Sequence, residues 1–105
     1  MSQETSVITR NRIAIQEPPM YKVLVHNDDY TPMEFVVDLL KRLFRKDDTT
    51  AHQIMLEVHE TGVGVGGVYT QDVAETKAAQ AHSLARSQEY PLRCSVELDA
   101  GGGSF

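Results

Sequence analysis

Hydrophobic and polar residues alternate in three short stretches of the chain, and this pattern predicts three β-strands. The first stretch covers residues 20–26, where Tyr21, Val23 and Val25 alternate with other residues, and the last covers residues 92–98. The middle stretch, residues 63–70, carries three glycines. Glycine inside a strand is typical of a bulge or of a close approach by another part of the backbone, so we expect one of these there.

A helical pattern follows the first predicted strand. Its apolar positions have the three- and four-residue spacing of a buried helical stripe: Val36, Leu39, Leu40 and Leu43. Thr31 and Glu34 have the spacing of a capping box, with Pro32 at the first helical position. We therefore predict a helix that starts after an N-cap at Thr31 and runs to about Arg45.

Two further helices are predicted from the same kind of pattern. The first covers about residues 50–61, with Thr50 and Gln53 as a second capping box and Gly62 as its left-handed end. The second covers about residues 71–87 and has a face of small residues suited to tight packing, formed by Ala74, Ala78, Ala81 and Ala85.

The predicted order of elements, β-α-α-β-α-β, indicates an α/β fold (an α+β sandwich) in which a three-stranded antiparallel sheet packs against three helices. Two adjacent prolines, Pro18 and Pro19, end any preceding helix and favour an extended connection. We therefore expect one domain over residues 18–99, a flexible N-terminal extension at 1–17 and a disordered glycine-rich tail at 100–105.

Length and charge narrow the possible functions. The chain has 105 residues, and its ten Lys and Arg against fifteen Asp and Glu give a formal net charge of −5, which disfavours binding to nucleic-acid backbones. The sequence shows neither the apolar segment of a signal peptide nor a run of about 20 apolar residues able to cross a membrane. The single cysteine, Cys94, has no internal disulfide partner. We expect a cytoplasmic monomer.

Candidate chemistry lies in two places. Asn27, Asp28 and Asp29 follow the first strand, where such residues ordinarily form a turn, but two adjacent carboxylates also offer free acceptors for a cation. Met55, Val58 and His59 share one face of the second helix. Packing in the core accounts for Met55 and Val58, whereas a buried His59 would need a partner for each ring nitrogen.

Enzyme chemistry has weaker support in the sequence. His26, Asp28, Asp29, His52 and His59 could ligate a metal, but their spacing matches no common metal motif. Cys94 alternates inward on a strand and is typical of core packing, and no nucleophile-elbow or phosphate-loop pattern occurs. A small metal-dependent enzyme that uses Asp28, Asp29 and His59 remains the alternative hypothesis, although we expect no metal or other cofactor.

The chain closely resembles the ClpS adaptor family over about residues 18–98, in four blocks at compatible spacing: NDDYTPMEFV (27–36), MLEVH (55–59), GVYTQDVAETK (67–77) and YPLRCSVE (90–97). The resemblance implies the small ClpS α/β fold. It also implies a non-enzymatic adaptor that recognises proteins by a hydrophobic N-terminal residue (Leu, Phe, Tyr or Trp). The family delivers such proteins to the N-terminal domain of the ClpA-type AAA+ unfoldase for degradation by ClpP.

The resemblance also assigns roles to residues of this chain. The site for the N-terminal amino group falls on Asn27, Asp28 or Asp29, and His59. The hydrophobic pocket falls on six residues, with Met33 as its gate: Thr31, Met33, Val36, Met55, Val58 and Leu92. The surface for the unfoldase falls on Asp72, Thr76 and Lys77.

Overall fold

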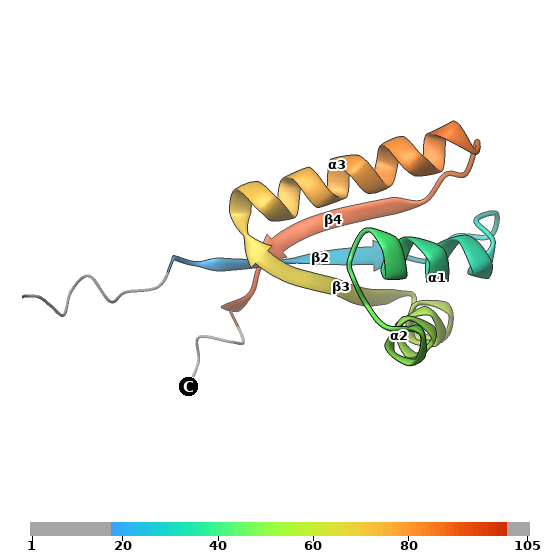
Figure 1. Cartoon of the computed structure of the whole chain (residues 1–105), viewed down its shortest axis with the longest axis horizontal. Coiled ribbons are helices and arrows are strands. Elements are labelled where there is room, and N and C mark those ends of the chain that lie inside the picture. Colours follow the sequence, from blue (N-terminus) through green and yellow to red (C-terminus); the bar gives the residue numbers. More distant parts are fainter. Residues whose placement is uncertain (1–17, 101–105) are drawn as a thin grey trace, which may run out of the picture.

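A computed structural model describes residues 18–100 (Figure 1). Its elements are β2 (Met20–His26), α1 (Met33–Arg42), α2 (Asp48–Thr61), β3 (Val63–Thr70), α3 (Gln71–Ser87) and β4 (Arg93–Leu98). The predicted fold class and the order β-α-α-β-α-β are confirmed. The predicted N-terminal extension, 1–17, and the predicted tail beyond Ala100 lie outside the described residues.

The three strands form one antiparallel sheet in the order β3-β2-β4, so β2 is the central strand. In the register, Val23 of β2 lies opposite Gly67 of β3, but the next residue, Leu24, lies opposite Val65. Gly66 is therefore an extra residue in β3, and the bulge predicted from the glycines of this strand is confirmed.

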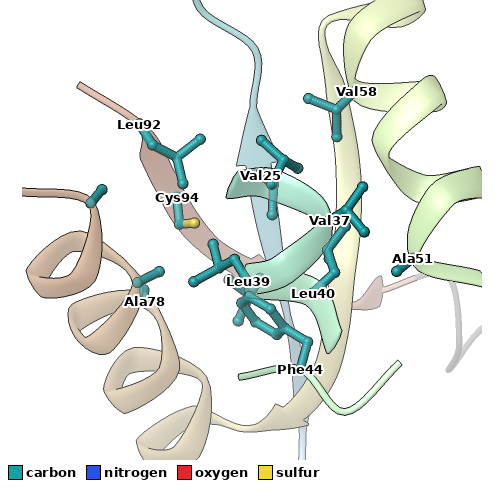
Figure 2. Packing of buried hydrophobic residues seen from close by; sticks show 14 of the residues in the cluster. Val25, Val37, Leu39, Leu40, Phe44, Ala51, Val58, Ala78, Leu92 and Cys94 are labelled. Carbon is teal, nitrogen blue, oxygen red and sulfur yellow. The ribbon is translucent and has the colours of Figure 1, made fainter. Parts of the chain in front are cut away.

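The helices build the core against the sheet. Figure 1 shows α3 running along the sheet beside β4, while α1 and α2 lie near the end at which β2 finishes. The core contains Val23 of β2, which is fully buried. It also contains Val25 of β2, Leu40 of α1 and Cys94 of β4, which are buried as well (Figure 2). The predicted alanine face of α3 is buried too, because small side chains let this helix approach the strands closely: Ala74, Ala78, Ala81 and Ala85.

Both predicted capping boxes are wrong. The N-cap of α1 is Pro32, which has no side-chain cap bond, and the Thr31 hydroxyl instead donates to Asp28 Oδ2 over 2.7 Å. Helix α2 begins at Asp48, two residues before the predicted start, because Asp47 is its N-cap and accepts a hydrogen bond from the Thr50 amide. In both loops, the side chain of an aspartate three residues before the threonine accepts the hydrogen bond from the threonine amide.

The C-terminal end of α2 was predicted correctly, but that of α1 was not. Helix α1 stops at Arg42 rather than Arg45, and Arg45 has a left-handed φ of 59° that no helix can contain. Helix α2 ends at Thr61, and Gly62 caps it as predicted, with a left-handed φ of 95° that glycine adopts without strain. None of the helices within residues 18–100 is long and apolar enough to cross a membrane.

Candidate functional site

The loop between β2 and α1 is organised by Asp28. Its Oδ1 accepts hydrogen bonds from the amides of Tyr30 and Thr31, each with 2.8 Å between N and Oδ1, while Oδ2 accepts from the Thr31 hydroxyl. Partial burial alone raises the pKa of Asp28, but these hydrogen bonds outweigh it and hold the pKa below its ordinary value. The carboxylate is therefore ionised, and it both shapes the loop and leaves negative charge there.

The same loop is joined to the end of α2. The Asn27 amide donates to the Gly62 carbonyl over 2.9 Å, and Gly62 in turn donates to Val58 at the end of the helix. His59 lies in the last turn of α2, and its side chain is exposed rather than buried. The structure thus brings together the two segments that carry Asn27, Asp29 and His59, and all three side chains are open to solvent.

The six predicted pocket residues divide into a floor and a rim. Val36, Val58 and Leu92 belong to the core, with exposed fractions of 6%, 2% and 1%. Met55 and Thr31 are half-buried, and Met33 is 44% exposed at the start of α1. Figure 2 shows Val58 on α2 and Leu92 before β4 on either side of Val25 in this view. Buried apolar side chains and a flexible, exposed methionine are the types of side chain that an apolar ligand group contacts.

A cavity of about 360 Å³ lies in the groove between α1 and α2. Met33 and Met55 both line it, so the structure brings these two predicted residues together from different helices. The remaining lining was not predicted from sequence: Glu34, Val37, Asp38, Lys41, Asp48 and His52. Lys41 and Asp48 form an ion pair of 3.0 Å that spans the groove from α1 to the start of α2. The other four predicted pocket residues do not line this groove.

Sequence reasoning also missed the group that fixes Leu92. Arg86, at the end of α3, donates to the carbonyls of Tyr90 and Leu92 over 2.7 and 3.1 Å. The Tyr90 ring packs edge-on against Phe35 of α1, with 5.0 Å between centroids. The positive charge of Arg86 also contributes to lowering the pKa of Asp28. Arg86 therefore supports two parts of the site at once, but no motif marks such a contact in the sequence.

The residues assigned to the unfoldase surface lie on α3. Asp72 and Thr76 are exposed, but Lys77 is half-buried and its Nζ donates to the Leu43 carbonyl over 2.9 Å. The same ammonium lies 5.7 Å from the centroid of the Tyr69 ring. Lys77 thus connects α3 to the end of α1. In Figure 1 the start of α3 lies at the opposite end of the sheet from α1 and α2.

Two further candidates for enzyme chemistry are a metal site and the thiol of Cys94. Within residues 18–100, no three His, Cys, Asp or Glu side chains come together to hold a metal ion. Desolvation in the core raises the pKa of Cys94 to about 11, although Arg93 opposes the shift, so its thiol is protonated at neutral pH. Cys94 is therefore a packing residue, and the nucleophilic thiolate is absent.

Comparison with known proteins identifies the family. A family model described as ATP-dependent Clp protease adaptor protein ClpS matches residues 16–95. The ATP-dependent Clp protease adapter protein ClpS of Desulfotalea psychrophila is 53% identical over 97 residues, which cover 92% of this chain and 95% of that protein. The chain belongs to the ClpS family. The corresponding protein of Maricaulis maris is 52% identical over 99 residues, covering 94% of this chain and 91% of that one.

A solved ClpS structure supports the same assignment. The structure of Agrobacterium tumefaciens ClpS2 bound to L-phenylalaninamide is 41% identical and superimposes with a TM-score of 0.76, covering 79% of this chain and 100% of that one. The resemblance to ClpS that the four sequence blocks predicted is confirmed, together with the ClpS fold. The ClpS relatives are named as adapters of a protease rather than as enzymes.

Proposed function

We propose that this chain is a non-enzymatic, monomeric adaptor in the cytoplasm. It binds proteins whose unmodified N-terminal residue is Leu, Phe, Tyr or Trp and delivers them to a ClpA-type AAA+ unfoldase for degradation by ClpP. The observation that carries the proposal is the ligand of the solved relative, since phenylalaninamide combines a free α-amino group with an aromatic side chain. The loop and pocket residues of this chain offer complementary chemistry to both groups.

Three acceptors are available for the amino group. An α-amino group has a pKa of about 7.7–8.0, so near neutral pH it is mostly an ammonium with three donors. Asn27 Oδ1, a carboxylate of Asp28 or Asp29 and a ring nitrogen of His59 supply the acceptors. Asp28 already accepts three hydrogen bonds, which leaves about one lone pair for a ligand, whereas the Asp29 carboxylate is exposed. Each charge-assisted bond contributes roughly 1.5–3 kcal/mol.

The ligand side chain lies against the apolar floor and is covered by the methionines. Burial of a Leu or Phe side chain beside Val36, Val58 and Leu92 contributes roughly 1.5–3 kcal/mol, and Thr31, Met33 and Met55 line the entrance. Together with the ammonium contacts, this gain offsets an association cost of about 4–15 kcal/mol. Micromolar binding or somewhat tighter follows, and such an affinity lets an adaptor release its cargo.

Delivery uses a separate surface on α3. Asp72 and Thr76 are exposed, so both are accessible for direct contact with the unfoldase's N-terminal domain. Lys77 is held by Leu43 and Tyr69, so it shapes this surface as well as contributing charge. The substrate site and the delivery surface lie on different elements, and a substrate can therefore stay bound while the unfoldase docks.

Fluorescence anisotropy with labelled peptides tests the substrate class. Peptides that differ only in the first residue should bind when it is Leu, Phe, Tyr or Trp and should fail with Gly, Ser or Glu. Acetylation of a Leu-initiated peptide should abolish binding, because it removes the charge and two of the three donors. Equal affinity for the acetylated and the free peptide would contradict the proposed role of Asn27, Asp28, Asp29 and His59.

A further inference from the structure

The connecting segment, residues 88–92, joins α3 to β4 and ends on the proposed pocket floor at Leu92. The register of β2 and β4 ends with His26 opposite Arg93. Because the two strands are antiparallel, Leu92 precedes Arg93 at the same end of the ladder at which Asn27 follows His26. The connecting segment therefore lies beside the loop to which we assign the amino group of the ligand.

Local preference alone does not fix the shape of the connecting segment. Glu89 has a left-handed φ of 63°, which is unfavourable for a residue with a Cβ. Pro91 has no amide proton, so the residue next to Leu92 cannot donate a backbone hydrogen bond. The position of Leu92 therefore depends on contacts between the connecting segment and the rest of the fold.

Arg86 and Tyr90 supply these contacts. Nη1 of Arg86 donates to the carbonyls of Tyr90 and Leu92, and its two protons match the two acceptors. The Tyr90 amide donates to the Ala85 carbonyl over 2.9 Å. The Tyr90 ring packs edge-on against Phe35, with an angle of 69° between the two ring planes. The connecting segment is thus fixed to the end of α3 on one side and to α1 on the other.

The contact with Phe35 links the floor of the pocket to its rim. Phe35 lies in the first turn of α1, between Met33 and Val36 in the sequence. A movement of the connecting segment therefore changes the distance between Leu92 and the first turn of α1. A planar aromatic ring has to fit that space as a whole, whereas a leucine side chain is smaller and can change its rotamer.

We propose that Arg86 is a positioning residue, which acts through the connecting segment to set the width of the hydrophobic pocket and thereby its selectivity between aromatic and aliphatic first residues. Tyr90 acts with it, because it holds the same segment against Phe35. Neither side chain touches the ligand in this role. The role rests on the proposed function, since it concerns the pocket for the first residue of the cargo.

Two substitutions release the connecting segment. Arg86→Gln loses the paired donors, and Tyr90→Leu keeps an apolar side chain but loses the ring contact with Phe35. In anisotropy measurements, each should weaken the binding of Phe- and Trp-initiated peptides by at least about tenfold more than that of a Leu-initiated peptide, the change that one methylene makes in a hydrophobic pocket. The Leu-initiated peptide should still bind, which shows that the variants are folded.

Two matched variants should keep the ratio of affinities that the wild type has. Arg45→Gln makes the same substitution at an exposed arginine between α1 and α2. Tyr90→Phe removes the hydroxyl but keeps the ring that packs against Phe35.

The ratio separates positioning from an effect of charge. Arg86 contributes to lowering the pKa of Asp28, so loss of its charge alone would change the affinity of every ammonium ligand by one common factor. An unchanged ratio in Arg86→Gln, or a shift in favour of Phe and Trp, would overturn the proposed role. Where Arg86→Gln binds no peptide, Tyr90→Leu decides by the same ratio. If the wild type binds none of the peptides, the proposed function fails, and the role of Arg86 fails with it.

Discussion

His82 on α3 accepts a hydrogen bond from the backbone amide of Cys94 on β4, with 2.9 Å between Nε2 and N. Because β4 is an edge strand and each amide has one proton to donate, this bond satisfies an amide that the ladder with β2 does not use. The bond joins α3 to β4, the strand that follows Leu92. Because Nε2 of His82 is the acceptor, this nitrogen carries no proton.

Removing that acceptor should destabilise the fold. We expect His82→Ala to lower the free energy of unfolding by about 1–3 kcal/mol, because the half-buried amide of Cys94 loses its partner. His82→Gln, whose side-chain oxygen is also an acceptor, should recover part of the loss. Urea unfolding followed by circular dichroism measures both variants. An unchanged urea midpoint for His82→Ala would show that the contact adds nothing to stability.

The lowered pKa of Asp28 predicts a loss of stability in acid. A carboxyl whose pKa is lower in the folded state stabilises that state above its ordinary pKa of 3.8, and the contribution disappears as the pH falls through the lower value. Asp28→Asn removes the titrating group. The difference in unfolding free energy between the wild type and Asp28→Asn should therefore be largest above about pH 5 and shrink below about pH 4. A constant difference over this range would contradict the assignment.

Gly64 lies where α2 packs directly onto β3. A Cβ at this position would come within 2.8 Å of Val58 Cγ2 and 3.3 Å of Ile54 Cγ2. Valine has little rotamer freedom in a helix, so α2 must shift. We expect Gly64→Ala to cost about 1–3 kcal/mol of stability and to weaken peptide binding, since Val58 belongs to the proposed pocket floor. Val65→Ala, on the exposed face of the same strand, is the control and should do neither.

Met33 at the rim should control which first residues enter the pocket. An unbranched side chain can close the entrance to β-branched residues while it admits Leu or Phe. We expect Met33→Ala to bind peptides that begin with Ile or Val, which the wild type should reject in anisotropy measurements. Leu56→Ala changes an exposed aliphatic residue elsewhere on α2 and should keep the wild-type selectivity. Continued rejection of Ile by Met33→Ala would show that another residue is the gate.

Lys77 should have a double role that Thr76 lacks. Lys77→Ala loses the hydrogen bond to Leu43 and should lower the free energy of unfolding by about 1 kcal/mol or more, besides weakening binding to the unfoldase's N-terminal domain. Thr76→Ala should weaken that binding without a change in stability. Both variants should keep their peptide affinity to within about 0.5 kcal/mol, as expected for distant surface changes. Loss of peptide binding in Thr76→Ala would mean that the two sites overlap.

The hydrophobic pattern predicted every element between residues 18 and 100, because burial on one face of a strand or helix requires that pattern. Helix starts were harder. In Asp28-x-x-Thr31 and Asp47-x-x-Thr50 an aspartate accepts the threonine amide, so the threonine itself caps nothing. The aspartate carboxylate is a stronger acceptor than the threonine hydroxyl. A search for Thr-x-x-Glu or Thr-x-x-Gln alone overlooks this aspartate.

The candidate site was predictable only where residues are neighbours in sequence. The Asn27–Asp29 segment and the Met55–His59 segment were both found, but the bond between Asn27 and Gly62 that joins them depends on the register of the folded sheet. The burial of Lys77 against Leu43 and the hold of Arg86 on Leu92 are likewise contacts between residues distant in sequence. Local spacing carries no signal for such contacts.

The loop that begins at Asn27 and the start of α3 lie at the two ends of the same central strand, since Thr70 lies opposite Met20 at the first residue of β2. A strand of the seven residues in β2 is about 23 Å long. Under the proposed function, a cargo chain end and the unfoldase held at the two ends of this strand have an effective concentration that reaches the millimolar range. The rigid spacing of the two ends would then make the two modest affinities act together, without a change of shape passing along the sheet.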